Sequence, residues 1–143
     1  MRSAAGFTLI EIMVVVLIIA GLASLVGVKV IGQLCRSRAE TTKIQIKNLE
    51  SGLKLFKIDN GFYPETQQGL EALVMEPSLG RQVRKFPQGG YLDGDNIPKD
   101  SWGKEFQYIG PDQTGNGSYE IISPGDDGEL QTDDDCTIDR CEC

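Results

Sequence analysis

Acidic side chains near the C-terminus are the residues of this chain whose types and spacing could do chemistry. Six carboxylates lie within ten residues: Asp126, Asp127, Glu129, Asp133, Asp134 and Asp135. Carboxylates this close repel one another, which raises the free energy of the folded chain unless a cation sits among them. Oxygen ligands and a tight glycine turn suit Ca²⁺, although the ligand spacing of an EF-hand is missing. The segment is therefore either a solvated acidic turn or a calcium site.

Four cysteines form a second group with possible chemistry. Cys35 stands alone, whereas Cys136, Cys141 and Cys143 crowd the end of the chain. Such a tail favours structural disulfides formed outside the cytoplasm. A zinc site is the alternative, but it needs four ligands, and only three cysteines lie close together in a chain without histidine. The spacing leaves the pairing of the cysteines open.

The composition argues against an enzyme. The 143 residues include no histidine, which removes the usual general base and the Ser–His and Cys–His nucleophile pairs. A membrane-tethered hydrolase using Asp134 and Asp135 with a metal is an alternative, but no second acid–base set or nucleophile arrangement accompanies this pair. The net charge of −7 also argues against nucleic acid as a partner. We therefore predict a non-enzymatic protein that does not bind nucleic acid.

An apolar segment follows a short polar leader at the N-terminus. Residues 12–28 are almost unbroken Ile, Val, Leu, Met, Ala and Gly. With residues 7–11 and 29–31 the segment is long enough to cross a bilayer, which takes about 20 residues. A cleavable signal peptide and a plain single-span anchor are the two simple interpretations.

Glu11 fits neither of these simple interpretations. A carboxylate inside an apolar segment costs about 2.5–3.5 kcal/mol on membrane insertion scales. That cost is offset if a cation meets the carboxylate. Cleavage after Gly6 would create one, the new amino group of Phe7, about one helical turn from Glu11. In an assembly of staggered parallel helices, the amine of one copy can meet the glutamate of its neighbour.

The rest of the chain predicts one small α+β domain. Apolar or small residues at positions 35, 39, 42, 46, 49, 53 and 56 alternate spacings of four and three, as on one face of a helix. We expect a long helix over residues 7–58, followed by a short helix over 67–75 capped by Thr66. Two strands, residues 105–109 and 119–122, would form an antiparallel sheet against the long helix, with Trp102 as a packing anchor.

The junction Gly6-Phe7-Thr8-Leu9-Ile10-Glu11 resembles the leader junction of type IV prepilins and pseudopilins. The resemblance implies that prepilin peptidase removes residues 1–6 by cutting between Gly6 and Phe7, and then methylates the Phe7 amine. It also implies that Glu11 guides each subunit into the filament. Residues 7–31 would form the transmembrane and filament-core half of the helix. Residues 32–143 would form a periplasmic domain that includes its amphipathic second half.

Several further segments resemble the major pseudopilin of type II secretion more than other pilins. They are Tyr63-Pro64, Thr66 to Leu73, Pro98 to Gly103, Gly125 to Gly128, and Asp133 to Asp135. The resemblance implies a type IV pilin-like fold, and a structural subunit of a periplasmic pseudopilus that drives protein export. A subunit of a surface type IV pilus or of a DNA-uptake pseudopilus is the alternative, supported by the Cys-rich tail.

The resemblance also implies location, partners and a cofactor. The chain would cross the bacterial inner membrane once, with its C-terminal domain in the periplasm. Its partners would be further copies of itself, minor pseudopilins, the inner-membrane platform and assembly ATPase, prepilin peptidase and the outer-membrane secretin. One Ca²⁺ would bind in the last loop. The implied ligands are the carboxylates of Asp127, Asp134 and Asp135, the backbone carbonyls of Pro124 and Glu129, and an oxygen of Thr132.

Overall fold

A computed structural model describes the backbone of residues 6–141, and the side chains of residues 6–24 and 32–141. Residues 1–5 of the expected leader and Cys143 lie outside the described residues. The chain divides into two compact units, residues 1–35 and residues 36–143. Helix α1 (Leu9–Asn60) contributes to both units.

The described part of the first unit consists of the start of α1 and the non-helical residues 6–8 before it. The helix begins at Leu9, two residues after the expected start, because Thr8 caps it: the backbone N–H of Glu11 donates to Thr8 Oγ1 (3.3 Å). The large apolar side chains of residues 7–22 are exposed by between 46% and 80%. Within the parts of the chain whose side chains are described, no helix has both the length and the apolar content that crossing a membrane requires.

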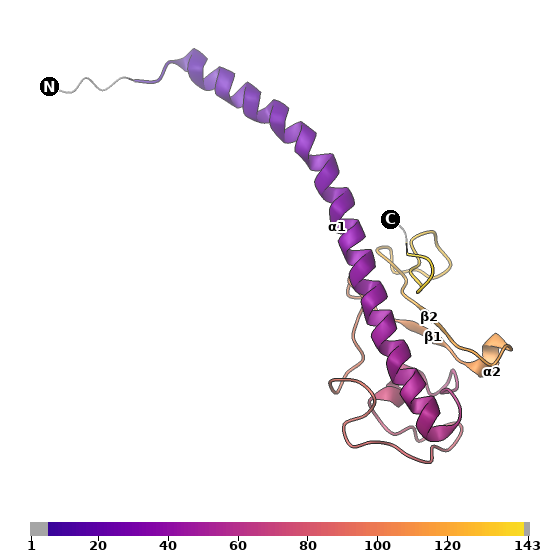
Figure 1. The fold of residues 1–143 in the computed structure, drawn as a ribbon. Coiled ribbons are helices and arrows are strands. Elements are labelled where there is room, and N and C mark those ends of the chain that lie inside the picture. The colour runs from indigo at the N-terminus through magenta and orange to yellow at the C-terminus, as the bar shows by residue number, and fades with distance from the viewer. Residues whose placement is uncertain (1–5, 142–143) are drawn as a thin grey trace. The chain divides into compact units, whose positions relative to one another are not determined.

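The second unit contains the rest of α1 and all of the remaining elements. Helix α1 ends where Gly61 adopts a left-handed conformation (φ 85°), which lets its N–H donate to the carbonyl of Lys57 (2.7 Å). The 3₁₀ helix η1 (Leu70–Leu73) follows, then strand β1 (Gln107–Ile109), helix α2 (Pro111–Thr114) and strand β2 (Glu120–Ile122) (Figure 1).

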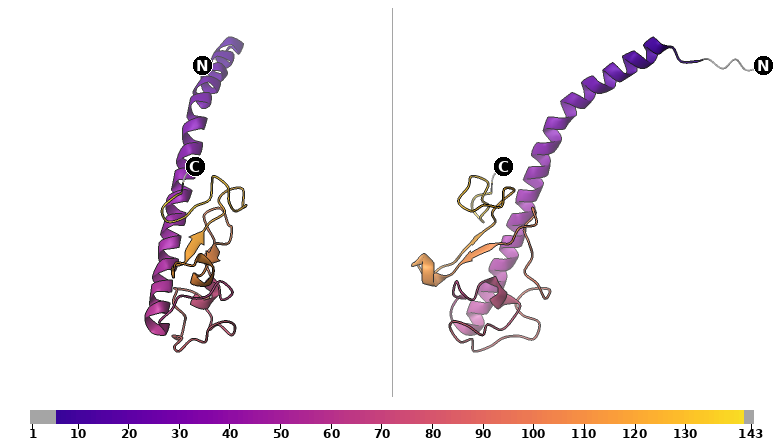
Figure 2. Two further views of the ribbon diagram at one scale, coloured as in Figure 1. Left: turned by 90° about the vertical axis from the view of Figure 1, so that its right-hand side faces the viewer. Right: turned by 180° about the vertical axis from the view of Figure 1, so that it is seen from behind.

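The two strands form an antiparallel hairpin. Residue pairs 107 and 122, 108 and 121, and 109 and 120 face each other across it. The views in Figure 2 agree in placing this hairpin and the loops around it against the second half of α1. The predicted α+β architecture, a long helix with a small antiparallel sheet, is therefore confirmed, although the strands are shorter than expected.

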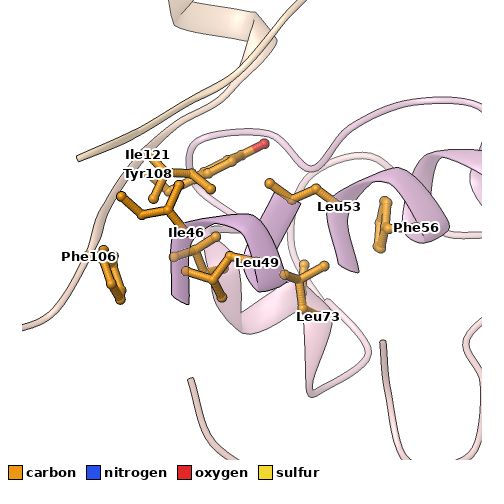
Figure 3. Close-up of a cluster of buried hydrophobic side chains, with 10 residues drawn as sticks. Ile46, Leu49, Leu53, Phe56, Leu73, Phe106, Tyr108 and Ile121 are labelled. Atoms are coloured by element: carbon orange, nitrogen blue, oxygen red, sulfur yellow. The ribbon is translucent and has the colours of Figure 1, made fainter. Parts of the chain in front are cut away.

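The hydrophobic core lies where the hairpin and η1 meet one face of α1. This face carries Ile46, Leu49, Leu53 and Phe56, each exposed by 1% or less. Figure 3 shows these side chains converging with Leu73 of η1, Phe106 just before β1, Tyr108 of β1 and Ile121 of β2. The face with alternating spacings of four and three is thus the core face from Ala39 to Phe56, as the sequence predicts.

The second predicted helix differs from the expectation. It spans only Leu70–Leu73, and Thr66 does not cap it. The Thr66 hydroxyl instead donates to Asp112 Oδ1 (2.9 Å) and accepts from the N–H of Gly110 (2.9 Å). Gly69, whose φ of 63° requires a residue without a side chain, precedes the helix in place of a polar cap.

The core face of α1 can be tested by shortening one fully buried side chain. We expect Leu53→Ala to lower the free energy of unfolding by about 2–5 kcal/mol, because it removes buried methyl groups and leaves a cavity. The matched control is Leu55→Ala on the same helix, where Leu55 is 52% exposed. This control should change stability by less than about 0.5 kcal/mol. Urea unfolding followed by circular dichroism measures both, and equal losses would contradict the assigned core face.

Candidate functional site

The acidic residues form one loop, residues 124–135, that leaves the end of β2 and returns to the same place. Ser123 and Cys136 pair at its base through two backbone hydrogen bonds, of 2.8 and 2.9 Å. Both residues are fully buried. The loop is therefore closed at its base by main-chain bonds that water does not reach.

Asp100 holds the base of the acidic loop in position. This buried aspartate accepts the Ser123 hydroxyl through Oδ2, and the backbone N–H groups of Trp102 (3.0 Å) and Lys104 (2.7 Å) through Oδ1. Trp102 is only half-buried and is not among the residues that form or line the core, so the structure does not support its expected role as the packing anchor of the sheet. Asp100, two residues before Trp102, instead connects the base of the acidic loop to residues 102–104, a role that was not predicted from the sequence.

Asp134 organises the interior of the acidic loop. Its Oδ2 accepts the backbone N–H groups of Asp126 (2.8 Å) and Asp127 (3.1 Å), and its Oδ1 accepts the Thr132 hydroxyl (2.7 Å). These bonds, led by the one from Thr132, favour the charged carboxylate and lower the pKa of Asp134. Gly125 lies so close to Asp134 that a side chain at this position would collide with it.

The other two expected carboxylates accept backbone hydrogen bonds within the acidic loop, although Asp127 is exposed. Asp127 Oδ1 accepts the N–H of Glu129 (2.8 Å), and Asp135 Oδ2 accepts the N–H of Gln131 (2.7 Å). The second oxygen of Asp135, Oδ1, is buried and has no hydrogen-bond partner among the described residues. A buried carboxylate oxygen without a donor is costly, so this atom fits a ligand position for a cation.

The remaining expected ligands lie in the same loop. The Pro124 carbonyl accepts the N–H of Gly128 (3.1 Å), and the Glu129 carbonyl lies 3.1 Å from the Thr132 hydroxyl. Among residues 6–141, no three side chains of His, Cys, Asp or Glu cluster as a metal-binding group. A cation in this loop would therefore need carbonyl and hydroxyl oxygens beside the carboxylates, as hard cations such as Ca²⁺ accept.

The cysteine tail follows the acidic loop directly, and the structure resolves part of its pairing. Cys136 forms a disulfide with Cys141. Cys35 is also disulfide-bonded, so the described part of the chain has no free cysteine. The prediction of structural disulfides is therefore supported for Cys136 and Cys141 of the tail and for Cys35 of α1, and the zinc alternative is not supported.

The N-terminal site residues lie at the start of the first unit. Gly6 and Phe7 are non-helical and exposed, and the chain around Gly6 is open, because nothing lies within 4 Å of where a side chain would begin. Glu11 lies in the first turn of α1, and its side chain is exposed among apolar neighbours. The peptide bond between Gly6 and Phe7 thus precedes the helix in exposed, non-helical chain that a peptidase could reach.

Comparisons with known proteins match nearly the whole chain. The family model for type II secretion system protein G matches residues 29–140, and a prokaryotic N-terminal methylation motif matches residues 1–26. The type II secretion system core protein G of Klebsiella michiganensis is 42% identical over 134 residues, covering 94% of this chain and 92% of the relative. That of Pseudomonas aeruginosa is 41% identical over 138 residues, covering 96% and 94%.

A solved structure supports the same relationship. The crystal structure of the major pseudopilin from the type 2 secretion system of enterohaemorrhagic Escherichia coli superposes with a TM-score of 0.65 at 35% identity. It covers 73% of this chain and 89% of that chain. These matches favour the protein-secretion interpretation over the surface pilus and DNA-uptake alternatives.

The lowered pKa of Asp134 predicts a pH dependence of stability. A carboxylate whose pKa is lower in the folded chain contributes stability in full above its unfolded pKa of about 3.9, and loses it as pH falls through the folded value. We expect the gap in Tm between the wild type and Asp134→Asn to be wide at pH 7 and to narrow toward pH 3. Asp133→Asn, at an exposed neighbour, is the control. A gap that is constant across this pH range would show that the charge of Asp134 does not stabilise the fold.

Proposed function

This chain belongs to the type II secretion system protein G family of pseudopilus subunits, and we propose that many copies polymerise through their apolar helices into a periplasmic filament. The role is structural, with no catalytic step. The observation that carries the proposal is the row of exposed apolar side chains over residues 7–22, with one carboxylate, Glu11, near the start of α1. Such a surface must be covered, first by lipid and then by the helices of other copies.

Processing at the N-terminus precedes assembly in this proposal. Prepilin peptidase removes residues 1–6 and methylates the new amine of Phe7. The match of residues 1–26 to the methylation motif supports this step, as does the open, non-helical chain at Gly6. The leader lies on the cytoplasmic side, residues 7–31 cross the inner membrane once, and residues 32–143 lie in the periplasm. The Cys136–Cys141 disulfide is consistent with that oxidising compartment.

The remaining partners follow from the place of a major pseudopilin in its secretion system. The platform protein and the assembly ATPase would draw subunits from the membrane, and minor pseudopilins would contact the filament of identical copies. The filament would push exported proteins toward the outer-membrane secretin. The family membership supports these contacts. The negative net charge of the chain argues against nucleic acid as a partner.

Assembly is tested by removing the charge of Glu11 and keeping its size. We expect Glu11→Gln to insert in the membrane and to be processed normally, yet to lose most of its polymer. Breaking a buried ion pair costs about 3–5 kcal/mol, and each subunit contact would lose one such pair. The readouts are sedimentable filament and protein secretion in cells whose only copy of the gene carries the change.

The matched control for this experiment is Glu40→Gln, which removes an exposed carboxylate from the same helix outside the apolar segment. It should leave assembly and secretion intact. Normal filaments from Glu11→Gln would reject the role of the glutamate. Loss of twitching or of DNA uptake with secretion unaffected would reject the role in secretion.

The acidic loop is a calcium site in this proposal. Asp127, Asp134 and Asp135 would supply carboxylates, Pro124 and Glu129 backbone carbonyls, and Thr132 a further oxygen. The unpartnered buried oxygen of Asp135 supports this set, because it lacks the positive group that a cation would provide. When bound, the ion would neutralise the crowded carboxylates and join the two ends of the loop.

Calcium removal tests this site. We expect the full chain in detergent to have a higher Tm with millimolar Ca²⁺ than with chelator. At a free Ca²⁺ concentration near 100 times Kd, the free energy of unfolding should rise by about 2.7 kcal/mol. Asp135→Asn should lose most of this effect, and Asp133→Asn should keep it, because the exposed Asp133 is not among the expected ligands. Identical melting temperatures with calcium and with chelator would reject the site.

A further inference from the structure

The cysteine tail forms a closed turn directly behind the acidic loop. The disulfide joins Cys136 to Cys141. Inside this ring, the N–H of Thr137 donates to the Arg140 carbonyl (2.6 Å), and the N–H of Arg140 donates to the Thr137 hydroxyl (3.1 Å). The three cross-links fix the direction in which residues 137–141 leave Cys136.

The closed turn contacts the acidic loop at two places. Cys136 is fully buried and forms one half of the backbone pair that closes the base of the loop. Arg140 reaches the other part of the loop, where its Nη2 donates to the carbonyl of Thr132 (3.4 Å). Each of the two contacts involves or adjoins an expected cation ligand. Thr132 is one itself, and Asp135 directly precedes Cys136.

The same turn is attached to helix α1. Cys141 Sγ lies 3.6 Å from the Ala39 carbonyl oxygen, and Ile138 packs against the core. The adjacent helix residue, Arg38, lies 3.8 Å from the carboxylate of Asp126 in the acidic loop. Helix, tail and acidic loop are therefore connected in a ring of contacts, and the disulfide closes the part that no regular secondary structure supports.

We propose that the Cys136–Cys141 disulfide and cation binding in the acidic loop are energetically coupled, so that oxidation of the tail strengthens binding of the ion. The inference rests on the proposed calcium function of that loop. The physical reason is that both need the same arrangement: a closed Ser123–Cys136 base, and Thr132 and Asp135 held beside it. Without the disulfide, Arg140 and Cys141 are no longer linked to Cys136, so the contact of Arg140 with the Thr132 carbonyl is held less firmly and the ion must order more of the loop when it binds.

Linkage makes this coupling reciprocal. If oxidation tightens cation binding by some factor, the cation must favour the disulfide over the dithiol by the same factor. The redox step is the oxidation of two thiols, Cys136 and Cys141. They lose two protons and two electrons to a disulfide oxidant such as oxidised glutathione, which becomes two reduced glutathione molecules. Exchange can start at Cys141, which is half-buried, whereas Cys136 is not exposed.

The first test compares calcium affinities by titration calorimetry of the full chain in detergent. We expect Kd to be about tenfold higher for the double variant Cys136→Ser, Cys141→Ser than for the oxidised wild type, a factor in the usual range of coupling between sites. The control is Leu70→Val, which removes one methylene group from the core at η1 and leaves the acidic loop untouched. It should lower Tm without changing Kd.

The second test needs no substitution. The wild type is equilibrated in glutathione buffers with calcium or with chelator, and its thiols are then alkylated. Tandem mass spectrometry locates the alkyl label on individual cysteines, so it reports the disulfide fraction at Cys136 and Cys141 separately from that at Cys35. We expect calcium to raise the equilibrium constant for this disulfide by about tenfold.

The outcomes separate this inference from the function on which it rests. A higher Kd in the double variant, together with a calcium-dependent disulfide equilibrium in the wild type, supports the coupling. Calcium binding that is equal in both proteins, with an equilibrium that calcium does not shift, rejects the coupling and keeps the calcium site. No calcium binding to the oxidised wild type rejects both.

Discussion

One carboxylate in an apolar surface constrains this molecule more than any other interaction. Glu11 stands among exposed apolar side chains at the start of α1, which lipid or other helices would surround in the proposed membrane-bound and assembled states. An unpaired charge costs several kcal/mol in that setting, whereas a paired one costs much less. Within residues 7–24 the sequence contains no cationic side chain that could pair with it. In the proposed processing, cleavage before Phe7 would create an amino group that can pair with Glu11, and in the proposed filament this amine would come from the neighbouring copy.

The domain that follows is small and depends on cross-links as well as on its core. Its apolar core consists of one face of α1, the short η1 and a hairpin of three-residue strands. A core of this size leaves long loops with little apolar support. Buried polar contacts hold them instead: Asp100 holds the base of the acidic loop, and Asn60 accepts the backbone N–H groups of Arg84 and Lys85. The acidic loop therefore keeps its shape through hydrogen bonds and one disulfide.

Regular spacing made the helix and its core face predictable from sequence. The positions from Ala39 to Phe56 needed only the helical period, and the turn at Gly61 needed only the conformational freedom of glycine. The role of Thr66 could not be read in this way. Its hydroxyl bonds to Gly110 and Asp112, which lie more than forty residues later in the connection between the two strands. For the same reason, the sequence did not predict the role of Asp100, whose partner Ser123 lies on another segment. It also did not predict the pairing of Cys136 with Cys141.

The residues of the acidic loop could be predicted from the sequence, but the hydrogen bonding of each carboxylate could not. Clustered carboxylates pointed to the acidic loop, and the resemblance implied which of them would be ligands, but only the structure shows how each one is bonded. Asp134 accepts three hydrogen bonds inside the loop, Asp135 keeps one buried oxygen without a donor, and Asp133 is exposed. Backbone donors decide these differences, and their directions depend on turns such as the one at Gly125.

The proposed assembly requires that Glu11 meets the amine of a processed N-terminus. Mass analysis of the mature protein, isolated from membranes and from filaments, tests this requirement. We expect a chain that begins at Phe7, with Met1 to Gly6 removed and one methyl group added to the amine. A filament subunit that still begins at Met1 would contradict it, because the carboxylate would then have no amine to meet.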